Sequence, residues 1–516
     1  MRARFTAPAG IRSESLGSSA KPKPPQPHWR LDDVKLSTKS PSQALLYSRA
    51  NLFPKRFLMT RQPASQISPV MSRLSAYIAA ALRRPLPAAV IEKTRHHILD
   101  TIAAMVSGSR LAPGIKAIAY VKTLGGAKEA CVIGSNIFTT AVNAALANGM
   151  LAHADETDDS HAPSLTHPGC GIVPAALAMA ERERRDGAAL LRAVALGYDV
   201  GCRLTQSLDA YQFREDGHST HSFGPMFGAA AAAGALAGLQ QRQVRHLLSF
   251  TAQQASGISC WMRDGEHVEK AFDFGGMPAR NGVAAATMVA NGFTGVDDVF
   301  AGERNFFVAY GRKPDPAVLV RGLGVTYEIM NTNIKRWSVG SPIQAPLDSL
   351  YHLIREHGIK AQEVEKVVVR VARQGANTVD NRDMPDICLQ HMCAIMLIDG
   401  NVTFASSHDV RRMRDRRVLA LRSRIELRAD DALSAAMPSR QGIVEISLRD
   451  GRELRHHTKA VRGTAENPMT RAEVDEKSYD LMAPVIGRTR ARKLCDAVWQ
   501  LEKVRDVRGL RPLLGA

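Results

Sequence analysis

Apolar residues recur with a helical period over most of the chain between residues 68 and 325. Matches to a period of about 3.6 residues fall at 70–83, 88–107, 114–123, 138–153 and 188–207. Residues 228–238 are almost all alanine and glycine. Because such a helix has little side-chain bulk, its neighbours can approach closely, and we expect it at the centre of the fold.

The pattern changes near residue 326 to short runs that are typical of strands. These runs fall at 364–372, 424–430, 442–449 and 453–461, with Asp450-Gly451 where a hairpin turn belongs. Helical patterns over 344–357 and 389–399 lie between them. Helical periodicity returns over 468–508, where Thr470 and Glu473 have the spacing of a capping box.

These patterns predict a mainly α fold with a second, smaller domain. A chain of 516 residues is too long for one ordinary core, so more than one domain is expected. We predict a large all-helical domain over 68–325, completed by C-terminal helices in 463–516. Residues 326–462 are predicted to form an α+β domain.

Residues 1–67 differ from the remainder in composition. The first 70 residues carry 12 Lys/Arg against 3 Asp/Glu, half of the whole chain's net charge of +18, and are rich in Pro and Ser. We predict a disordered basic extension. A targeting peptide, or a true start at Met59 or Met71, remains open. We predict no nucleic-acid partner for this segment.

The overall composition excludes several classes of protein. No run of about 18 apolar residues occurs, so no membrane span is expected. The seven cysteines form no CxxC pair, which argues against a disulfide framework or a structural zinc site and fits a reducing, cytoplasmic compartment.

Residues 153–168 carry the strongest sign of chemistry. The stretch holds four acids and three histidines between two helical patterns. Titratable groups crowded at a helix end shift one another's pKa, as proton transfer requires. The spacing matches neither H-E-x-x-H nor another ligand motif, so no metal is predicted.

Several separated motifs then occur in a fixed order. They are Asn148-Gly149, His153-x-x-Glu156-x-Asp158-Asp159-Ser160, Thr166-His167-Pro168, Gly197-Tyr198-Asp199-Val200-Gly201, Gly217-His218-Ser219-Thr220, Glu269-Lys270-Ala271-Phe272, Ile334-Lys335-Arg336-Trp337 and Asn467-Pro468-Met469-Thr470. Over roughly residues 68–510 the chain resembles the MmgE/PrpD family, which includes 2-methylcitrate dehydratase of propionate metabolism and cis-aconitate decarboxylase.

The resemblance implies an active site between the helical domain and an α+β lid. It implies a cofactor-free lyase, a homodimer and a small carboxylate substrate. The family's site positions fall on Glu156, Ser160, His167, His218, Lys270 and Lys335.

General chemistry agrees with these positions. Dehydration of a β-hydroxy acid needs a base and an acid, which histidines supply near neutral pH. We predict that His167 and His218 transfer protons and that Lys270 and Lys335 bind carboxylates. Glu156 either orients or protonates a histidine, or is a base if burial raises its pKa.

Departures from the family pattern leave the substrate open. Glu156 stands where aspartate is common, Asp273 follows Lys270, and Trp337 follows Lys335-Arg336. The main hypothesis is a hydro-lyase of the 2-methylcitrate dehydratase type. The alternatives are a decarboxylase of a cis-aconitate-like acid, an isomerase or epimerase of a dicarboxylate, and a scaffold without activity.

The remaining polar residues of 153–168 are expected to be structural. His153 is predicted to be a packed, hydrogen-bonded histidine and His161 a loop residue. Asp158 and Asp159 are expected to cap a helix or to pair with Lys or Arg.

Overall fold

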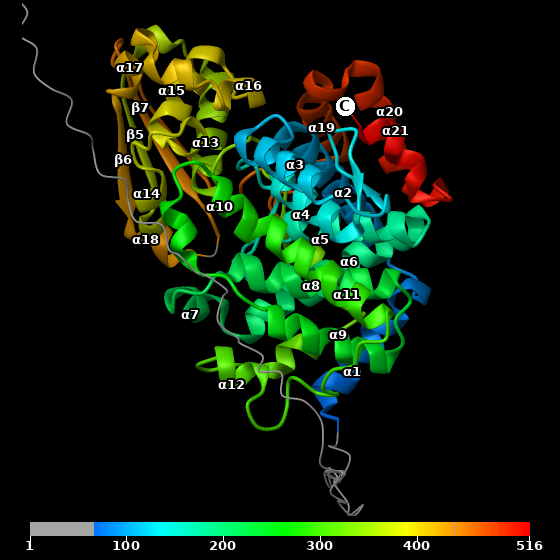
Figure 1. Cartoon of the computed structure of the whole chain (residues 1–516). Helices are drawn as coiled ribbons and strands as arrows, with labels where there is room; N and C mark the ends of the chain where they lie inside the picture. The colour runs from blue at the N-terminus through cyan, green and yellow to red at the C-terminus, as the bar shows by residue number, and fades with distance from the viewer. Residues whose placement is uncertain (1–66, 438, 516) are drawn as a thin grey trace, which may run out of the picture. The chain divides into compact units, whose positions relative to one another are not determined.

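The computed structural model describes residues 67–437 and 439–515 (Figure 1). The predicted N-terminal extension therefore lies outside the described residues, except for residue 67. The predicted mainly α class with a small α+β part is confirmed. Within the described residues, no helix is both long enough and apolar enough to cross a membrane.

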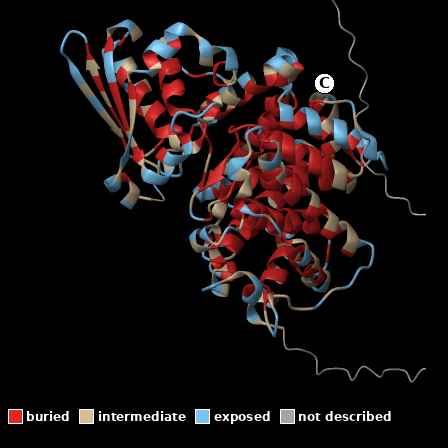
Figure 2. Ribbon diagram, turned by 60° about the vertical axis from the view of Figure 1, so that its left-hand side comes forward, coloured by how far each residue is buried: buried red, intermediate tan, exposed pale blue. Residues whose placement is uncertain are grey.

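The helical part is built around a central alanine-rich helix. Its main helices are α1 (Pro69–Ala80), α2 (Ala88–Gly108), α3 (Ala112–Leu124), α4 (Ala141–Ala152), α5 (Pro168–Arg182), α6 (Gly187–Ser207), α8 (Thr220–Leu236), α9 (Gln241–Gln254) and α11 (Met277–Ala290). Every residue of α8 is buried, as predicted, and Figure 2 shows the buried residues concentrated in these helices. A Cβ on Gly228 of α8 would lie 2.5 Å from the Gly197 carbonyl oxygen of α6, so glycine permits this close approach.

The C-terminal helices pack onto the same core. Helix α19 (Arg471–Ile486) lies against α2, and α20 (Arg488–Trp499) follows it (Figure 1). The predicted capping box is confirmed, because the Thr470 and Glu473 side chains each accept a backbone N–H at the start of α19. Buried apolar residues of 469–514 belong to the same cluster as those of 71–334.

A four-stranded mixed sheet forms the second part. Its strands are β5 (Val364–Ala372), β6 (Ile425–Asp430), β7 (Gly442–Leu448) and β8 (Glu453–Thr458), in the order β6-β5-β7-β8. Strand β5 is parallel to β6 and antiparallel to β7, and β7 pairs with β8 as the predicted hairpin. Helices α13 (Ser341–His357) and α15 (Leu389–Asp399) share a second apolar cluster with the sheet.

Two short antiparallel pairings were not predicted. Residues 138–153 were expected to form one helix, but Phe138–Thr139 is strand β2, paired with β1 (Ala130–Cys131). Helix α4 begins after Thr140, whose hydroxyl accepts the Asn143 N–H and so stops the helix from extending backwards. Strand β3 (Ser160–His161) pairs with β4 (Thr332–Asn333).

Candidate active site

The acid- and histidine-rich segment is a buried loop between α4 and α5. Residues 153–161 are all buried. The β3–β4 pairing brings the segment that carries Lys335 against this loop. Pro168 at the first position of α5 begins the helix immediately after His167, which fixes where that histidine lies.

Asp158 is the centre of the hydrogen-bond network. Its two carboxylate oxygens lie 2.9 Å from His153 Nδ1 and 3.0 Å from His167 Nδ1. Lys335 Nζ is 3.5 Å from Asp158 Oδ1. Burial opposes ionisation, but the two histidines and Lys335 hold the pKa of Asp158 well below its usual range. The sequence predicted that Asp158 caps a helix or pairs with Lys or Arg. It did not predict the hydrogen bonds to two histidines.

His167 is therefore a neutral imidazole with a defined tautomer. Burial lowers the pKa of His167 to about 4, although Asp158 acts in the opposite direction. Because an ionised carboxylate only accepts, His167 Nδ1 must donate to Asp158, which leaves Nε2 as an acceptor. His167 keeps 8% exposure whereas His153 is fully buried, so His167 Nε2 is the one open to a substrate.

Glu156 lies between the two predicted lysines. Lys270 Nζ donates to one carboxylate oxygen, and Lys335 Nζ lies 3.4 Å from the other and donates to the Glu156 carbonyl at 2.9 Å. Burial alone would raise the pKa of Glu156, but the two ammonium groups hold it well below its usual range. The suggestion that burial raises the pKa of Glu156 is thus wrong, because the lysines outweigh burial.

Aromatic rings form one wall of this cluster. Phe274 stacks on His221 with ring centroids 3.8 Å apart and on His153 at 4.2 Å. His221 also meets His167 edge-on at 5.2 Å. Burial, followed by the charges around it, lowers the pKa of His221 well below its usual range. Lys270 Nζ lies 5.3 Å from the Phe274 ring centroid, within cation–π range.

His218 is not brought to this cluster. Its ring stacks on Phe213 at 4.4 Å and has edge contacts with Phe223 and Tyr310 at 6.0 Å. His221 lies three residues later, about one helical turn on, and contacts His167 instead. The sequence motif selected His218 alone, and His221, which directly follows the motif of residues 217–220, was missed.

Asp273 bonds away from the cationic pair. It lies on η3 (Phe272–Gly276), a short π-helix that follows the α10 helix (Val268–Ala271) carrying Lys270. The Ser219 hydroxyl donates to Asp273, and burial raises the pKa of Asp273 to about 7. With a pKa of about 7, Asp273 is about half protonated at neutral pH, so it repels an anionic substrate less than an ordinary carboxylate would.

A second layer of polar groups holds the loop in place. Asp159 accepts hydrogen bonds from Tyr198 at 2.6 Å and from the Gly169 N–H at 2.9 Å, and it lies 2.7 Å from His97 Nδ1. From α19, Lys477 donates to Asp100 at 2.6 Å and to the Thr157 carbonyl at 3.1 Å. The C-terminal helices therefore help to position the loop.

The α+β part also reaches the loop. His408, which follows helix α16 (Phe404–Ser407), places Nε2 3.0 Å from Asp155 Oδ2. Burial opposes its charge, but Asp155 raises the pKa of His408 to about 9. Burial also raises the pKa of the nearby Asp386 carboxyl to about 7.

Two residue triads have the spacing of metal ligands. They are His153, Asp158 and His167, and His153, Glu156 and His267, with ligand atoms within 4.8 Å of one another in each triad. Lys335 lies beside both carboxylates and Lys270 beside Glu156. These ammonium groups balance the two carboxylates and oppose the binding of a further cation.

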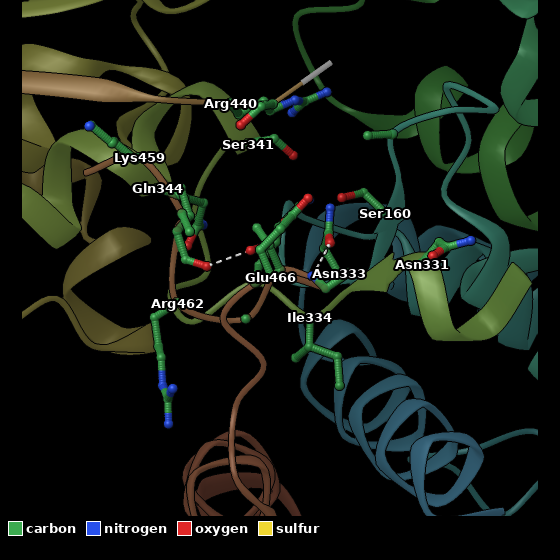
Figure 3. A pocket seen from close by; sticks show the side chains of 18 of the residues that line it. Ser160, Asn331, Asn333, Ile334, Ser341, Gln344, Arg440, Lys459, Arg462 and Glu466 are labelled. Carbon is green, nitrogen blue, oxygen red and sulfur yellow. Dashed lines mark hydrogen bonds between the residues drawn. The ribbon is translucent and has the colours of Figure 1, made fainter. Parts of the chain in front are cut away.

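Ser160 faces a separate part of the site. Together with Lys335 it lines a cavity of about 170 Å³, which Figure 3 shows from close by. Four of the predicted site residues thus lie together: Glu156, His167, Lys270 and Lys335. Ser160 is next to this group, because it lines the same cavity as Lys335.

Comparison with known proteins gives matches over nearly all of the described chain. The MmgE/PrpD N-terminal domain matches residues 72–319 and the MmgE/PrpD C-terminal domain matches residues 337–503. The cis-aconitate decarboxylase of Aspergillus terreus is 23% identical over 494 residues, 88% of this chain and 98% of the relative. The cis-aconitate decarboxylase-like protein oryM of Aspergillus oryzae is 26% identical over 307 residues, 56% of this chain and 62% of the relative.

Proposed function

The chain belongs to the MmgE/PrpD family, and on this premise we propose that it is a cofactor-independent lyase acting on a small di- or tricarboxylate. The observation that carries the proposal is His167. It is a neutral imidazole in a buried site, oriented by an ionised carboxylate that the Lys335 ammonium group also contacts.

These groups fit proton abstraction next to a carboxylate. His167 Nε2 takes the proton from the α-carbon, and the negative charge that spreads onto the carboxylate is stabilised by Lys270 and Lys335. The carbon–oxygen bond to the β-hydroxyl then breaks and a carbon–carbon double bond forms, while the His167 imidazolium returns its proton to the departing hydroxide, which leaves as water. Asp158 stabilises the imidazolium that forms meanwhile.

The reaction within the lyase class is proposed to be dehydration of the 2-methylcitrate dehydratase type. A histidine that is neutral at pH 7 serves a step that begins with a base. Isomerisation or epimerisation of a dicarboxylate would begin with the same step. Decarboxylation of a cis-aconitate-like acid is the second candidate, favoured by the names of the relatives that match this chain.

His221 is proposed as the partner of His167 in place of His218. It is buried, contacts His167 and Phe274, and lies in the cluster, whereas His218 contacts Phe213, Phe223 and Tyr310. Paired variants decide between the two: His221→Asn is expected to lower turnover by about 10²–10⁴-fold and His218→Asn to leave it nearly unchanged.

A substrate panel tests the proposal. Methylcitrate, citrate, cis-aconitate, malate-like acids and amino-dicarboxylates are incubated with the protein, and products are identified by NMR together with carbon dioxide release. Turnover of one of these acids supports a lyase, whereas turnover of only an uncharged compound contradicts the carboxylate site. If the protein turns over none of these compounds, the result supports the alternative of a scaffold without activity. The expected homodimer is checked by light scattering.

A further inference from the structure

The cavity of about 170 Å³ beside the histidine cluster is lined in part by Arg440, a cation to which the proposed function has given no role. Its lining includes Ser160 and Lys335 from the helical side, and Ser341, Gln344 and Arg440 from the α+β side. The cavity therefore shares Ser160 and Lys335 with the candidate active site. A substrate held there extends from one part of the fold to the other.

Arg440 differs from the lysines of the site in forming no ion pair, although the Glu156 carboxylate lies near enough to attract it. Lys270 and Lys335 both pair with Glu156. Among residues 67–437 and 439–515, the half-buried Arg440 side chain has neither an ion pair nor a hydrogen bond. In Figure 3 the Arg440 side chain extends from the Ser341 side towards the Ser160 side.

Two other cations at the cavity do not offer the same contact. Lys459 is exposed, and in Figure 3 its side chain points away from the other labelled residues. Arg462 also points away and is held by Glu473 at 2.5 Å. Of the arginines and lysines that line the described cavity, Arg440 is thus the one that is unpaired and directed across it.

A second guanidinium strengthens this assignment. Arg214, on helix α7 (Ala210–Glu215), is half-buried and, among the described residues, is in no ion pair. Burial, and then the charge of Arg214, lowers the pKa of Arg440 to about 10, although Glu156 acts in the opposite direction. An anion bound at Arg440 would offset both its burial and its repulsion by Arg214, and a planar carboxylate fits the paired donors of a guanidinium group.

We propose that Arg440 binds a second carboxylate of the substrate, distant from the one that lies at Lys270 and Lys335. This inference rests on the proposed function and narrows it. The substrate is an acid with at least two carboxylates, with its reacting carbons between Arg440 and His167. Arg440 then sets the preference for di- and tricarboxylates over monocarboxylates.

The test separates binding from turnover. Calorimetric titration uses tricarballylate, a tricarboxylate that has no hydroxyl to eliminate. Arg440→Gln is expected to weaken its binding by about 10- to 100-fold, because a charge-assisted hydrogen-bonded pair is lost. Arg440→Lys keeps the positive charge but loses the paired N–H donors. Its affinity for tricarballylate is expected to lie between those of the wild type and Arg440→Gln. Lys459→Gln removes the same charge from the same cavity and is expected to bind as the wild type does.

The outcomes are distinguishable from those of the substrate panel. If Arg440→Gln binds tricarballylate as the wild type does, if Lys459→Gln loses as much affinity, or if the wild type binds none, the inference is overturned. If Arg440→Gln loses affinity while no acid of the panel is turned over, the second-carboxylate site stands and the lyase proposal fails. With an active substrate, Arg440→Gln is expected to raise KM more than it lowers kcat. Unchanged thermal unfolding of each variant shows that folding is intact.

Discussion

The ion pair between His408 and Asp155 joins the α+β part to the buried loop of residues 153–161, and it makes stability depend on pH. His408 Nε2 lies 3.0 Å from Asp155 Oδ2, and their side chains are 19% and 4% exposed. Asp155 is fixed on the loop by Thr157, whose backbone N–H and hydroxyl both donate to it. Replacement of His408 by Gln removes the charge and leaves the carboxylate without its cation.

The magnitude follows from the pKa of His408. It is raised from 6.5 to about 9, which corresponds to about 3 kcal/mol at about 1.4 kcal/mol per pH unit. Because the folded-state pKa is the higher one, this stabilisation is complete below pH 6.5 and is lost as pH rises through about 9. His408→Gln is therefore expected to be less stable than the wild type by about 3 kcal/mol at pH 6, and by little above pH 9.

Urea unfolding of the two proteins at several pH values between 6 and 9.5 measures this difference. His352→Gln is the matched control, because His352 pairs with Glu356 at 2.8 Å but is 52% exposed. That variant should change stability by no more than about 0.5 kcal/mol, as exposed helix pairs do. A difference between wild type and His408→Gln that is the same at pH 6 and pH 9.5 would refute the reasoning.

Three further predictions concern the site. Asp158→Asn should lower kcat by about 10²–10⁴-fold with folding intact, because His167 loses its orientation and its counter-ion; near-normal kcat would show that Asp158 only packs. The acid limb of kcat/KM should lie near pH 4, since protonation of His167 at a pKa of about 4 removes the base; a limb near 6.5 would contradict this. Gly275→Ala should destabilise the fold by about 1–3 kcal/mol through overpacking, because its Cβ would lie 2.1 Å from the Gly149 carbonyl oxygen, whereas Gly265→Ala meets nothing within 4 Å.

Most secondary structure could be predicted because it depends on local patterns. The alanine-rich run predicts a buried central helix, and α8 is one. The Asp450-Gly451 turn predicts the β7–β8 hairpin, and Gly451 has the positive φ of 86° that such a turn favours. The pairing of β3 with β4 could not be predicted, because two-residue strands far apart in the chain carry no periodic signal.

The sequence selected several residues that the structure brings together, but it did not predict their electrostatics. Glu156, His167 and the two lysines could be selected from their motifs, but the state of Glu156 depends on ammonium groups 114 and 179 residues away. A pKa that is set by such distant partners cannot be read from local sequence. For the same reason, the sequence did not predict that Asp158 binds two imidazole rings.

The central claim is that His167, held neutral by its surroundings, removes a proton from a small carboxylic acid. NMR of the acid panel in D₂O, with wild type, His167→Asn and His218→Asn proteins, tests it most directly. The account predicts turnover or deuterium incorporation at the α-carbon with the wild type and His218→Asn, and a loss of about 10²-fold or more with His167→Asn. Equal rates for wild type and His167→Asn would contradict it.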